Sequence, residues 1–429
     1  MLRSLIPMNT MNKNTQQQSK RKQKQDKQNQ MKLNKLSKSK QNQMKQNQNR
    51  QNQHQSTRTN TITQSTILVT GGAGFIGSHL VDALSQQDQQ NKVIIIDDLS
   101  TGKIENIAHF FSKDDIDDIT KLKKQVKKQE TKQKHSAIAI QNKKEEQKKD
   151  GWIECCSDDQ QIIFCFVDIR NCVLLQKIFE KYTPDYVFHQ AAIPSVPRSV
   201  RDPIASNEAN VNGTINILNA ARKNNVKKIV YAASSSAYGD TPTLPKQESM
   251  PPLPLSPYAV SKLAGELYCK AFYEVYGLNY VCLRYFNVFG PRQDPKSEYA
   301  AVIPKFITLI QDGKSPVIFG DGEQTRDFTF VSDVVQANIK AAVSDAIGMF
   351  NVAGGKRISI NQLAESIASI LGETTIPTYE DARPGDVKHS LADISKANQA
   401  FNYQPRFDVQ DGLEETIKWF QQQRNQGNK

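Results

Sequence analysis

A glycine-rich turn between an apolar run and a helix-forming stretch constrains this chain most. Ile67-Leu68-Val69 predicts a buried strand, Thr70–Gly77 (TGGAGFIG) supplies the turn, and a helix is expected to continue to about Gln87. The glycines fit the spacing Gly72-x-Gly74-x-x-Gly77 and also Gly71-x-x-Gly74-x-x-Gly77. Glycines at a strand-to-helix turn let the backbone approach a pyrophosphate, and the helix N-terminus attracts its charge. The pattern therefore predicts a dinucleotide-binding unit.

The residue at the end of the next apolar run indicates which dinucleotide is bound. Val93–Ile96 predicts a second strand, and Asp97 follows it. A carboxylate there can accept hydrogen bonds from ribose hydroxyls and would repel a 2′-phosphate. NAD is therefore favoured over NADP, and Asp98 reinforces this preference. Asp168, after the third strand, has two open interpretations: it approaches the adenine amino group, or it caps the helix that follows.

The remaining pattern predicts an α/β fold. Strands are expected at Ile162–Phe166, Tyr186–Phe188, Lys228–Ala232 and Tyr280–Leu283, and helices from about Cys172, near 205–224 and at 257–276. This alternation predicts a Rossmann-type, doubly wound parallel sheet over residues 65–286. The elements become shorter after about Asn287, so residues 287–425 are expected to form a smaller α/β substrate domain, interleaved with the first.

Two segments fall outside this pattern. Residues 1–64 are rich in Gln, Asn and Lys and carry a formal charge of +13, whereas the whole chain carries +12. The rest of the chain is therefore almost neutral, which argues against nucleic-acid binding by the folded part. The tail is expected to be disordered, as a solvated appendage or a polyanion-binding arm. The lysine-rich stretch at about 111–150 predicts a surface insertion, with a transient helix over 121–134.

The composition also bears on the compartment. The six cysteines form no CxxC pair and no spacing typical of a metal site, so reduced thiols and no metal are expected. The chain contains no apolar run of the roughly 20 residues that a membrane span requires. We expect a cytoplasmic protein without a membrane partner. The basic N-terminus leaves organellar import as an alternative.

A tyrosine and a lysine four residues apart indicate the chemistry. Tyr258 and Lys262 lie one helical turn apart, so both side chains project from one face. A positive charge from Lys262 and from oxidised nicotinamide favours the phenolate, which can act as a base. Ser234, Ser235 and Ser236 follow the strand before this helix, where ligands bind in open α/β sheets. One of these hydroxyls can donate to the substrate oxygen, and the sequence does not rank them. The pattern predicts redox chemistry on a hydroxyl group.

Together these residues resemble the extended short-chain dehydrogenase/reductase superfamily, in particular its nucleotide-sugar epimerases. The resemblance runs from about Thr66 to Phe420, with a gap at the insertion. More closely, the chain is similar to the UDP-N-acetylglucosamine 4-epimerases. The matching runs include Asp168–Arg170, His189–Ala192, Ser195–Ser199, Arg284–Gly290, Arg292–Pro295, Tyr299–Lys305, Arg326–Phe328 and Gly385–Asp393.

The resemblance implies a mechanism and a partner. Tyr258 would take the proton of the sugar 4-hydroxyl while hydride passes to NAD, and the 4-keto sugar would turn before both are returned to the opposite face. Lys262 would also bind the nicotinamide ribose. A homodimer through a four-helix interface of the helices near 205–224 and 257–276 is usual in this superfamily. The implied cofactor-binding residues are Gly71, Gly74, Phe75, Ile76, Gly77, Asp97, Asp98, Thr101, Gly102, Asp168, Ile169, Gln190, Ala191, Ala192, Tyr258 and Lys262.

The resemblance also implies a site for a UDP-sugar. Arg326 and Arg383 match diphosphate ligands, as does Asn287, whose alternative is to cap the loop after its strand. Ala301 and Val302 would line the uracil pocket or simply open a helix. Ser390 stands where a bulky aromatic would exclude an N-acetyl group, so an acetamido sugar should fit, unless Ser390 is an ordinary exposed serine. The implied substrate-binding residues are Ser195, Arg198, Ser234, Asn287, Ala301, Val302, Arg326, Arg383, Asp386 and Ser390.

One departure and two rival functions accompany this expectation. Pro291 stands where bacterial relatives often carry Arg, which removes one polar contact. The first rival is a UDP-glucuronate 4-epimerase or decarboxylase, which would need a further cation for the C6 carboxylate. The second is a non-catalytic NAD-sensing or polyanion-binding protein that uses the basic tail.

Overall fold

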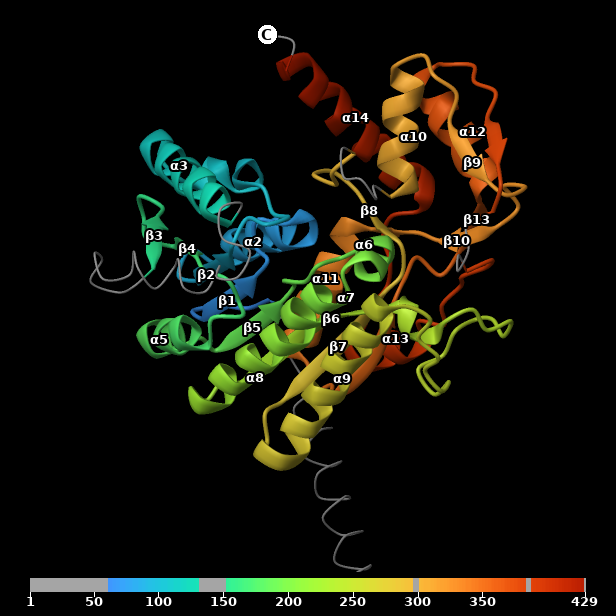
Figure 1. Cartoon of the computed structure of the whole chain (residues 1–429). Helices are drawn as coiled ribbons and strands as arrows, with labels where there is room; N and C mark the ends of the chain where they lie inside the picture. Colours follow the sequence, from blue (N-terminus) through green and yellow to red (C-terminus); the bar gives the residue numbers. More distant parts are fainter. Residues whose placement is uncertain (1–60, 131–151, 296–300, 383–386, 428–429) are drawn as a thin grey trace, which may run out of the picture. The chain divides into compact units, whose positions relative to one another are not determined.

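An eight-stranded sheet forms the centre of the protein (Figure 1). A computed structural model describes residues 61–130, 152–295, 301–382 and 387–427, except for the side chains of 127–130 and 427. The strand order is β12-β7-β6-β5-β1-β2-β4-β3, and every neighbouring pair is parallel except β3 and β4. This confirms the predicted fold class. The strands are β1 Thr66–Thr70, β2 Lys92–Asp97, β3 Ile153–Cys156, β4 Ile162–Phe166, β5 Tyr186–His189, β6 Lys228–Ser234, β7 Tyr280–Tyr285 and β12 Gly348–Val352.

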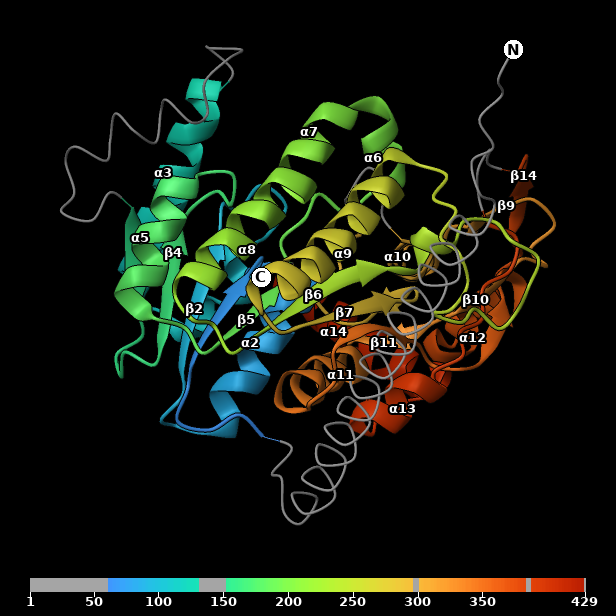
Figure 2. The same cartoon turned by 90° about the horizontal axis from the view of Figure 1, so that it is seen from below.

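Helices cover both faces of this sheet, because successive side chains of a strand point to opposite faces. In β1, Ile67 and Val69 belong to one core cluster and Leu68 to the other. The first cluster includes side chains of α2 (Phe75–Gln87), α3 (Lys113–Glu130) and α11 (Val331–Val343). The second includes side chains of α5 (Cys172–Tyr182), α8 (Gly213–Lys223) and α9 (Pro257–Tyr276). Figure 2 shows α8 and α9 on the face opposite to α2 and α11.

The part after residue 287 builds small sheets around a third core cluster. Its strands pair as β8 with β11, β9 with β14 and β10 with β13, while β12 joins the large sheet. The proposed domain boundary near residue 287 stays a prediction. The elements here are β8 Val288–Phe289, α10 Val302–Gln311, β9 Val317–Phe319, β10 Thr325–Asp327, β11 Thr329–Phe330, β13 Arg357–Ser359, α12 Ile360–Leu371, β14 Thr378–Glu380, α13 Ser395–Phe401 and α14 Val409–Gly427.

The helix expected near 205–224 is not a uniform α-helix. It consists of α7 (Pro203–Asn207), a π-helical turn η3 (Glu208–Asn212) and α8. A π turn widens the helix locally and is often found near functional sites. The short helix α6 (Val196–Arg201) precedes α7, and the 3₁₀ turns are η1 (Ile104–Asn106), η2 (Ala108–Phe110) and η4 (Ser235–Tyr238).

The insertion at 111–150 is more ordered than the sequence predicted. Instead of a transient helix over 121–134, α3 begins at Lys113, and the side chains of Ile119 and Leu122 are buried in the core. The ring of Phe111 lies edge-on to that of Phe164 in β4, with centroids 6.4 Å apart. The sequence also missed β3, which pairs antiparallel with β4. Residues 131–151 lie outside the described residues.

The predicted tail also ends earlier than residue 64. Ile62 is buried, its N–H donates to Gln87 Oε1 (2.9 Å), and its carbonyl accepts from Asn91 Nδ2 (2.8 Å). These contacts place the residues just before β1 against α2. The prediction of disorder for residues 1–60 falls outside the described residues. Within the described ranges, no helix is both long and apolar enough to cross a membrane.

The packing of α3 can be tested by Ile119→Ala. Deleting a buried isoleucine side chain should lower the free energy of unfolding by about 2–4 kcal/mol, from lost burial and the cavity left behind. Lys124→Ala, on the exposed side of the same helix, should change it by less than about 0.5 kcal/mol. Denaturant titration measures both. Equal values for the two variants would mean that α3 does not pack against the core.

Candidate active site

The glycine turn is held by contacts that leave no room for side chains. Gly71 has φ +70°, and its N–H donates to Ile96 O (2.8 Å) in β2. A Cβ on Gly71 would lie 2.7 Å from the backbone nitrogen of Ala191, and one on Gly77 only 2.1 Å from Gly71 O. Gly74 is the N-cap of α2 and provides no side-chain cap. The first N–H groups of α2 are therefore available to an anion, as a pyrophosphate requires.

Asp97 is a structural link as well as a candidate ribose ligand. Its carboxyl is buried and accepts from Ala73 N–H (3.0 Å) in the glycine turn and from Leu99 N–H (2.8 Å) in the next loop. A Cβ on Gly102 would lie 2.8 Å from this carboxyl, which explains a glycine there. Burial and the neighbouring Asp98 raise the pKa of Asp97 to about 7, against the opposing effects of the two N–H groups and Lys123. Each oxygen keeps a second lone pair, so the proposed ribose contact remains possible.

The two other acidic candidates lie close together. Burial, and then the charge of Asp168, raise the pKa of Asp98. Asp168 accepts from Arg170 through Nε (2.8 Å) and Nη2, so the guanidinium is held beside it. The alternative that Asp168 caps α5 is wrong, because Asn171 is the cap and accepts from Leu174 N–H (3.1 Å). The sequence left this cap ambiguous, because Asp168 and Asn171 are both residue types that commonly cap helices.

A buried histidine that the sequence did not single out fixes the end of β5. Nδ1 of His189 lies 2.6 Å from Thr70 Oγ1, and Nε2 lies 2.9 Å from Thr214 Oγ1. Thr70 Oγ1 also accepts from Ala191 N–H (3.2 Å). Burial, with a smaller contribution from the charge of Lys262, lowers the pKa of His189 to about 3, so the ring is neutral. The candidates Gln190, Ala191 and Ala192 are thus held against the glycine turn.

Tyr258 meets one of the three serines. It lies in the first turn of α9, which Ser256 caps by accepting from Ala259 N–H (3.2 Å). Burial raises the pKa of Tyr258, and a hydrogen bond with the Ser234 side chain lowers it. Ser234 Oγ accepts from both the N–H (3.2 Å) and the hydroxyl (2.8 Å) of Ser236, so its own proton is free to be donated to Tyr258. The geometry therefore favours Ser234 over Ser235 and Ser236 as the hydroxyl beside the base.

Lys262 is buried one turn further along α9. Its Nζ lies 4.6 Å from the ring centroid of Tyr231, and its side chain is almost inaccessible to solvent. Burial lowers the pKa of Lys262 to about 8, although Glu266 acts in the opposite direction. A lysine with this pKa is still mostly charged at neutral pH. It can therefore favour a neighbouring anion, as the proposed role requires.

A cavity of about 280 Å³ lies within the part after residue 286, and residues of β8, α10, β9, β10 and α12 line it. Four predicted substrate residues line it together: Asn287, Ala301, Val302 and Arg326. Ala301 and Val302 also open α10, so the two interpretations of this pair are compatible. The sequence assigned no role to other lining residues, although Gln293 and Phe328 lie in the matching runs Arg292–Pro295 and Arg326–Phe328. Among them are Gln293, Phe319, Gln324 and Phe328.

Ser390 lies next to this cavity, in contact with one of its lining residues. Its Oγ accepts from Asn287 Nδ2 (3.2 Å) and from Asp327 N–H (3.2 Å). Asn287 Nδ2 also donates to Asp327 O (3.1 Å), so its amide holds β10 instead of capping the loop after β7. Arg326 Nη1 donates to Thr325 O (3.0 Å) and Lys388 O (3.1 Å). The interpretation of Ser390 as an ordinary exposed serine is therefore wrong.

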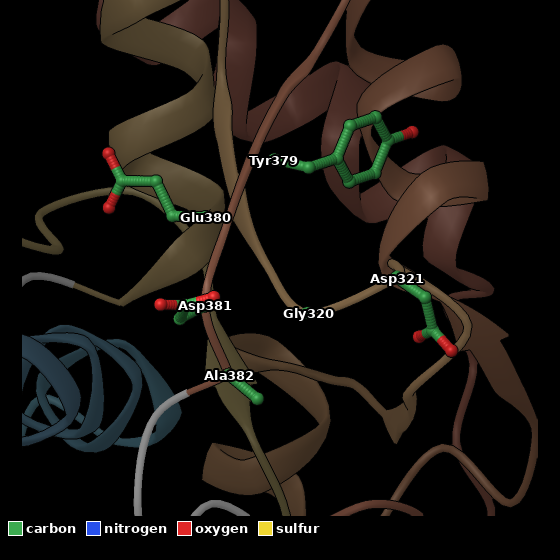
Figure 3. Close-up of a pocket in the computed structure, with 6 residues that line it drawn as sticks. All are labelled: Gly320, Asp321, Tyr379, Glu380, Asp381 and Ala382. Atoms are coloured by element: carbon green, nitrogen blue, oxygen red, sulfur yellow. The ribbon is translucent and has the colours of Figure 1, made fainter.

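Of the remaining substrate candidates, Ser195 has a structural role in a helix. Ser195 caps α6, where its Oγ accepts from Arg198 N–H (3.1 Å). Arg383 and Asp386 lie outside the described residues. An open depression of about 830 Å³ lies beside that gap and is lined by Gly320, Asp321, Tyr379, Glu380, Asp381 and Ala382. In Figure 3, Tyr379 and Glu380 point to opposite sides of their strand. Three of its described lining residues, Asp321, Glu380 and Asp381, are carboxylates.

Comparison with known proteins agrees with this geometry. Residues 67–150 and 128–353 match the family described as "NAD dependent epimerase/dehydratase family". The chain belongs to that family. It is an NAD-dependent enzyme of the UDP-sugar 4-epimerase type. The glycine turn fits NAD, because the N-terminus of α2 offers backbone N–H groups to a pyrophosphate, and a side chain at Gly71 or Gly77 would clash with the backbone that shapes the turn.

Three similar proteins are named for different UDP-sugars. UDP-glucose 4-epimerase of Mycolicibacterium smegmatis is 35% identical over 355 residues, which cover 82% of this chain and 97% of that one. UDP-glucuronate 4-epimerase of Thermodesulfobacterium geofontis is 37% identical over 258 residues, covering 60% and 78%. The structure of UDP-N-acetylglucosamine 4-epimerase from Methanobrevibacter ruminantium M1, in complex with UDP-N-acetylmuramic acid, is 42% identical with a TM-score of 0.70, covering 84% and 100%.

The raised pKa of Asp97 predicts a pH dependence of stability in the NAD-free protein. Between about pH 4 and 7 the folded state binds a proton on Asp97 that the unfolded state has released, so the free energy of unfolding should fall as pH rises. Asp97→Asn should remove this part of the slope. It should also lower the free energy of unfolding at every pH, because the amide nitrogen cannot accept the hydrogen bond that one carboxyl oxygen accepts now. Urea titrations across this pH range measure it. Identical slopes in both proteins would contradict the buried, protonated carboxyl.

Proposed function

We propose that this enzyme interconverts UDP-N-acetylglucosamine and UDP-N-acetylgalactosamine, with UDP-glucose and UDP-galactose as further substrates. The observation that carries the proposal is Ser390, a small residue in contact with Asn287 at the rim of the nucleotide cavity. A bulky aromatic in place of Ser390 would fill the space next to Asn287. The serine leaves room for an acetamido group.

The chemistry follows from Tyr258 and Ser234. The Tyr258 oxygen takes the proton of the 4-hydroxyl, while Ser234 donates to the same substrate oxygen as it becomes a carbonyl. Bound NAD supplies a reversible hydride acceptor. Tyr258 is protonated once it has taken the proton of the 4-hydroxyl. It returns that proton to the sugar oxygen after the 4-keto sugar has rotated to present its opposite face. Because burial raises the pKa of Tyr258, we propose that the charge of Lys262 joins the Ser234 hydrogen bond in favouring its phenolate.

The cavity provides the features that a UDP group needs. Phe319 and Phe328 give it apolar and aromatic surface, which suits a planar base, and Gln324 adds an amide. Arg326 contributes a planar cation that can bind phosphate oxygens. A phosphate contact of Asn287 stays a prediction from the sequence, because its Nδ2 already donates to Ser390 Oγ and Asp327 O. Arg383 and Asp386 are likewise predictions from the sequence.

The rival substrate is UDP-glucuronate, and the 37% identity to a UDP-glucuronate 4-epimerase supports it. A C6 carboxylate requires a cation near the sugar. Arg198 on α6 is the predicted sugar-site residue with that charge. The acetamido and the uronate proposals therefore depend on different residues, Ser390 and Arg198, and an assay can separate them.

Purified enzyme incubated separately with each UDP-hexose and with UDP-glucuronate tests this proposal. We expect turnover of both acetylated sugars, measured by chromatographic separation of the C4 epimers. Tyr258→Phe should keep its NAD and lose about two to four decades of rate, the usual contribution of general acid–base catalysis. Turnover of the uronate alone would refute the acetamido assignment, and near-normal rates in Tyr258→Phe would remove Tyr258 from the mechanism.

We also propose that the enzyme is a homodimer through the outer face of α7 and α9. Exposed apolar side chains gather there: Ile204 (72% exposed) on α7, and Val260, Leu267, Tyr268 and Val275 on α9. The α9 residues recur at spacings of seven or eight, so they form one stripe along the helix. Figure 2 shows α7 and α9 on the same side of the sheet. An apolar stripe of this kind is typical of an interface.

The dimer can be tested by sedimentation at micromolar concentration. The wild-type protein should sediment as a dimer. Leu267→Glu should sediment as a monomer, because a buried charge without a partner opposes association. Val173→Glu, at an equally exposed apolar site on α5, should stay dimeric. A monomeric wild-type protein would overturn the proposal, and a dimeric Leu267→Glu would place the interface elsewhere.

A further inference from the structure

A buried serine on α6 holds the backbone of Tyr258. Ser199 is completely inaccessible to solvent, its Oγ accepts from Tyr258 N–H (3.0 Å), and its hydroxyl proton is donated to Val196 O (2.7 Å). The N–H groups in the first turn of a helix have no partner inside that helix. Ser256, the cap of α9, takes the N–H of Ala259. The N–H of Tyr258 is therefore satisfied from a different element.

A second connection reaches the carbonyl of the same residue. Ser261 Oγ donates to Tyr258 O (2.8 Å) and accepts from Asn210 Nδ2 (3.0 Å) in the π turn. The Asn210 side chain in turn accepts from Ile193 N–H (2.7 Å) and donates to Ile193 O (3.2 Å). Both polar backbone groups of Tyr258 are thus connected to the segment 193–199.

That segment also carries predicted sugar-site residues. Ser195 caps α6, and Arg198 precedes Ser199 directly. A shift of α6 on sugar binding would therefore be transmitted through Ser199 to the turn that holds the base. The hydroxyl is suited to this buried position because it donates and accepts at the same time.

We propose that Ser199 is a positioning residue, which couples the sugar-facing helix α6 to the catalytic Tyr258. This rests on the proposed function, because Tyr258 must be the base. Alanine at this position would leave a buried N–H without an acceptor. The first turn of α9 would then be free to move, and small misplacements of a reacting group lower rates strongly.

The test compares Ser199→Ala with two other variants. Ser359→Ala removes a serine that caps α12, within the C-terminal part of the chain, so it is a matched control for the loss of a helix cap. Ser199→Thr keeps the hydroxyl. We expect Ser199→Ala to lower kcat about 10–100-fold with KM within about twofold of wild type and full NAD content. Ser359→Ala should leave kcat unchanged, and Ser199→Thr should recover most of it.

Amide hydrogen exchange gives a readout that does not require activity. The peptide containing Tyr258 should exchange at least tenfold faster in Ser199→Ala than in wild type or Ser359→Ala, because its N–H has lost an acceptor. Unchanged exchange together with unchanged kcat would overturn the proposal. If the wild-type protein epimerises none of the UDP-sugars, the proposed function fails, and exchange alone decides whether Ser199 holds Tyr258.

Discussion

A buried ion pair between α9 and β7 is the constraint on which the site depends. Arg284 donates to Glu266 through Nε (2.9 Å) and Nη2 (2.7 Å), and the two side chains are 2% and 0% exposed. Tyr258, Lys262 and Glu266 lie at successive turns of one helix face. The pair therefore fixes the angle at which that whole face meets the sheet. Removing one partner would leave the other charge buried, which costs about 3–5 kcal/mol.

The two halves of the site come from different kinds of structure. The cofactor side is built from backbone, since Gly71, Gly77 and Ala191 pack so closely that no side chain fits between them. The cavity proposed for the nucleotide is built from side chains, with Asn287, Arg326 and Phe319 at its wall. Ser234 ends β6, and Tyr258, which it meets, lies in the first turn of α9. On the proposed function, the choice of sugar would therefore depend on side chains and not on the glycine turn.

The sequence predicted the elements whose signals are local. Such signals are the apolar run before Gly71, the glycine spacing, and Pro257 and Gly277 at the ends of α9. Each determines structure within a few residues, and the elements expected from them are found in the structure. The sequence failed at α3, where Ile119 and Leu122 are spaced as a helix face but are surrounded by charged residues.

Residues that act through distant partners were also beyond the sequence. His189 contacts Thr70 across 119 positions, and Ser199 contacts Tyr258 across 59. Nothing in the neighbourhood of either residue in the chain indicates these pairings. Ser234 could be separated from Ser235 and Ser236 only when the geometry of the turn was known.

The two backbone hydrogen bonds that Asp97 accepts affect how cofactor choice could be redesigned. Exchanging the acid at the end of β2 is the obvious route to an enzyme that accepts a phosphorylated ribose. Here that carboxyl also ties the glycine turn to the following loop through Ala73 and Leu99. A substitution of Asp97 would remove these hydrogen bonds and destabilise the loop that must bind the new dinucleotide. Asp98, whose carboxyl bonds only locally to Ser100 N–H among the described contacts, is the safer position to alter.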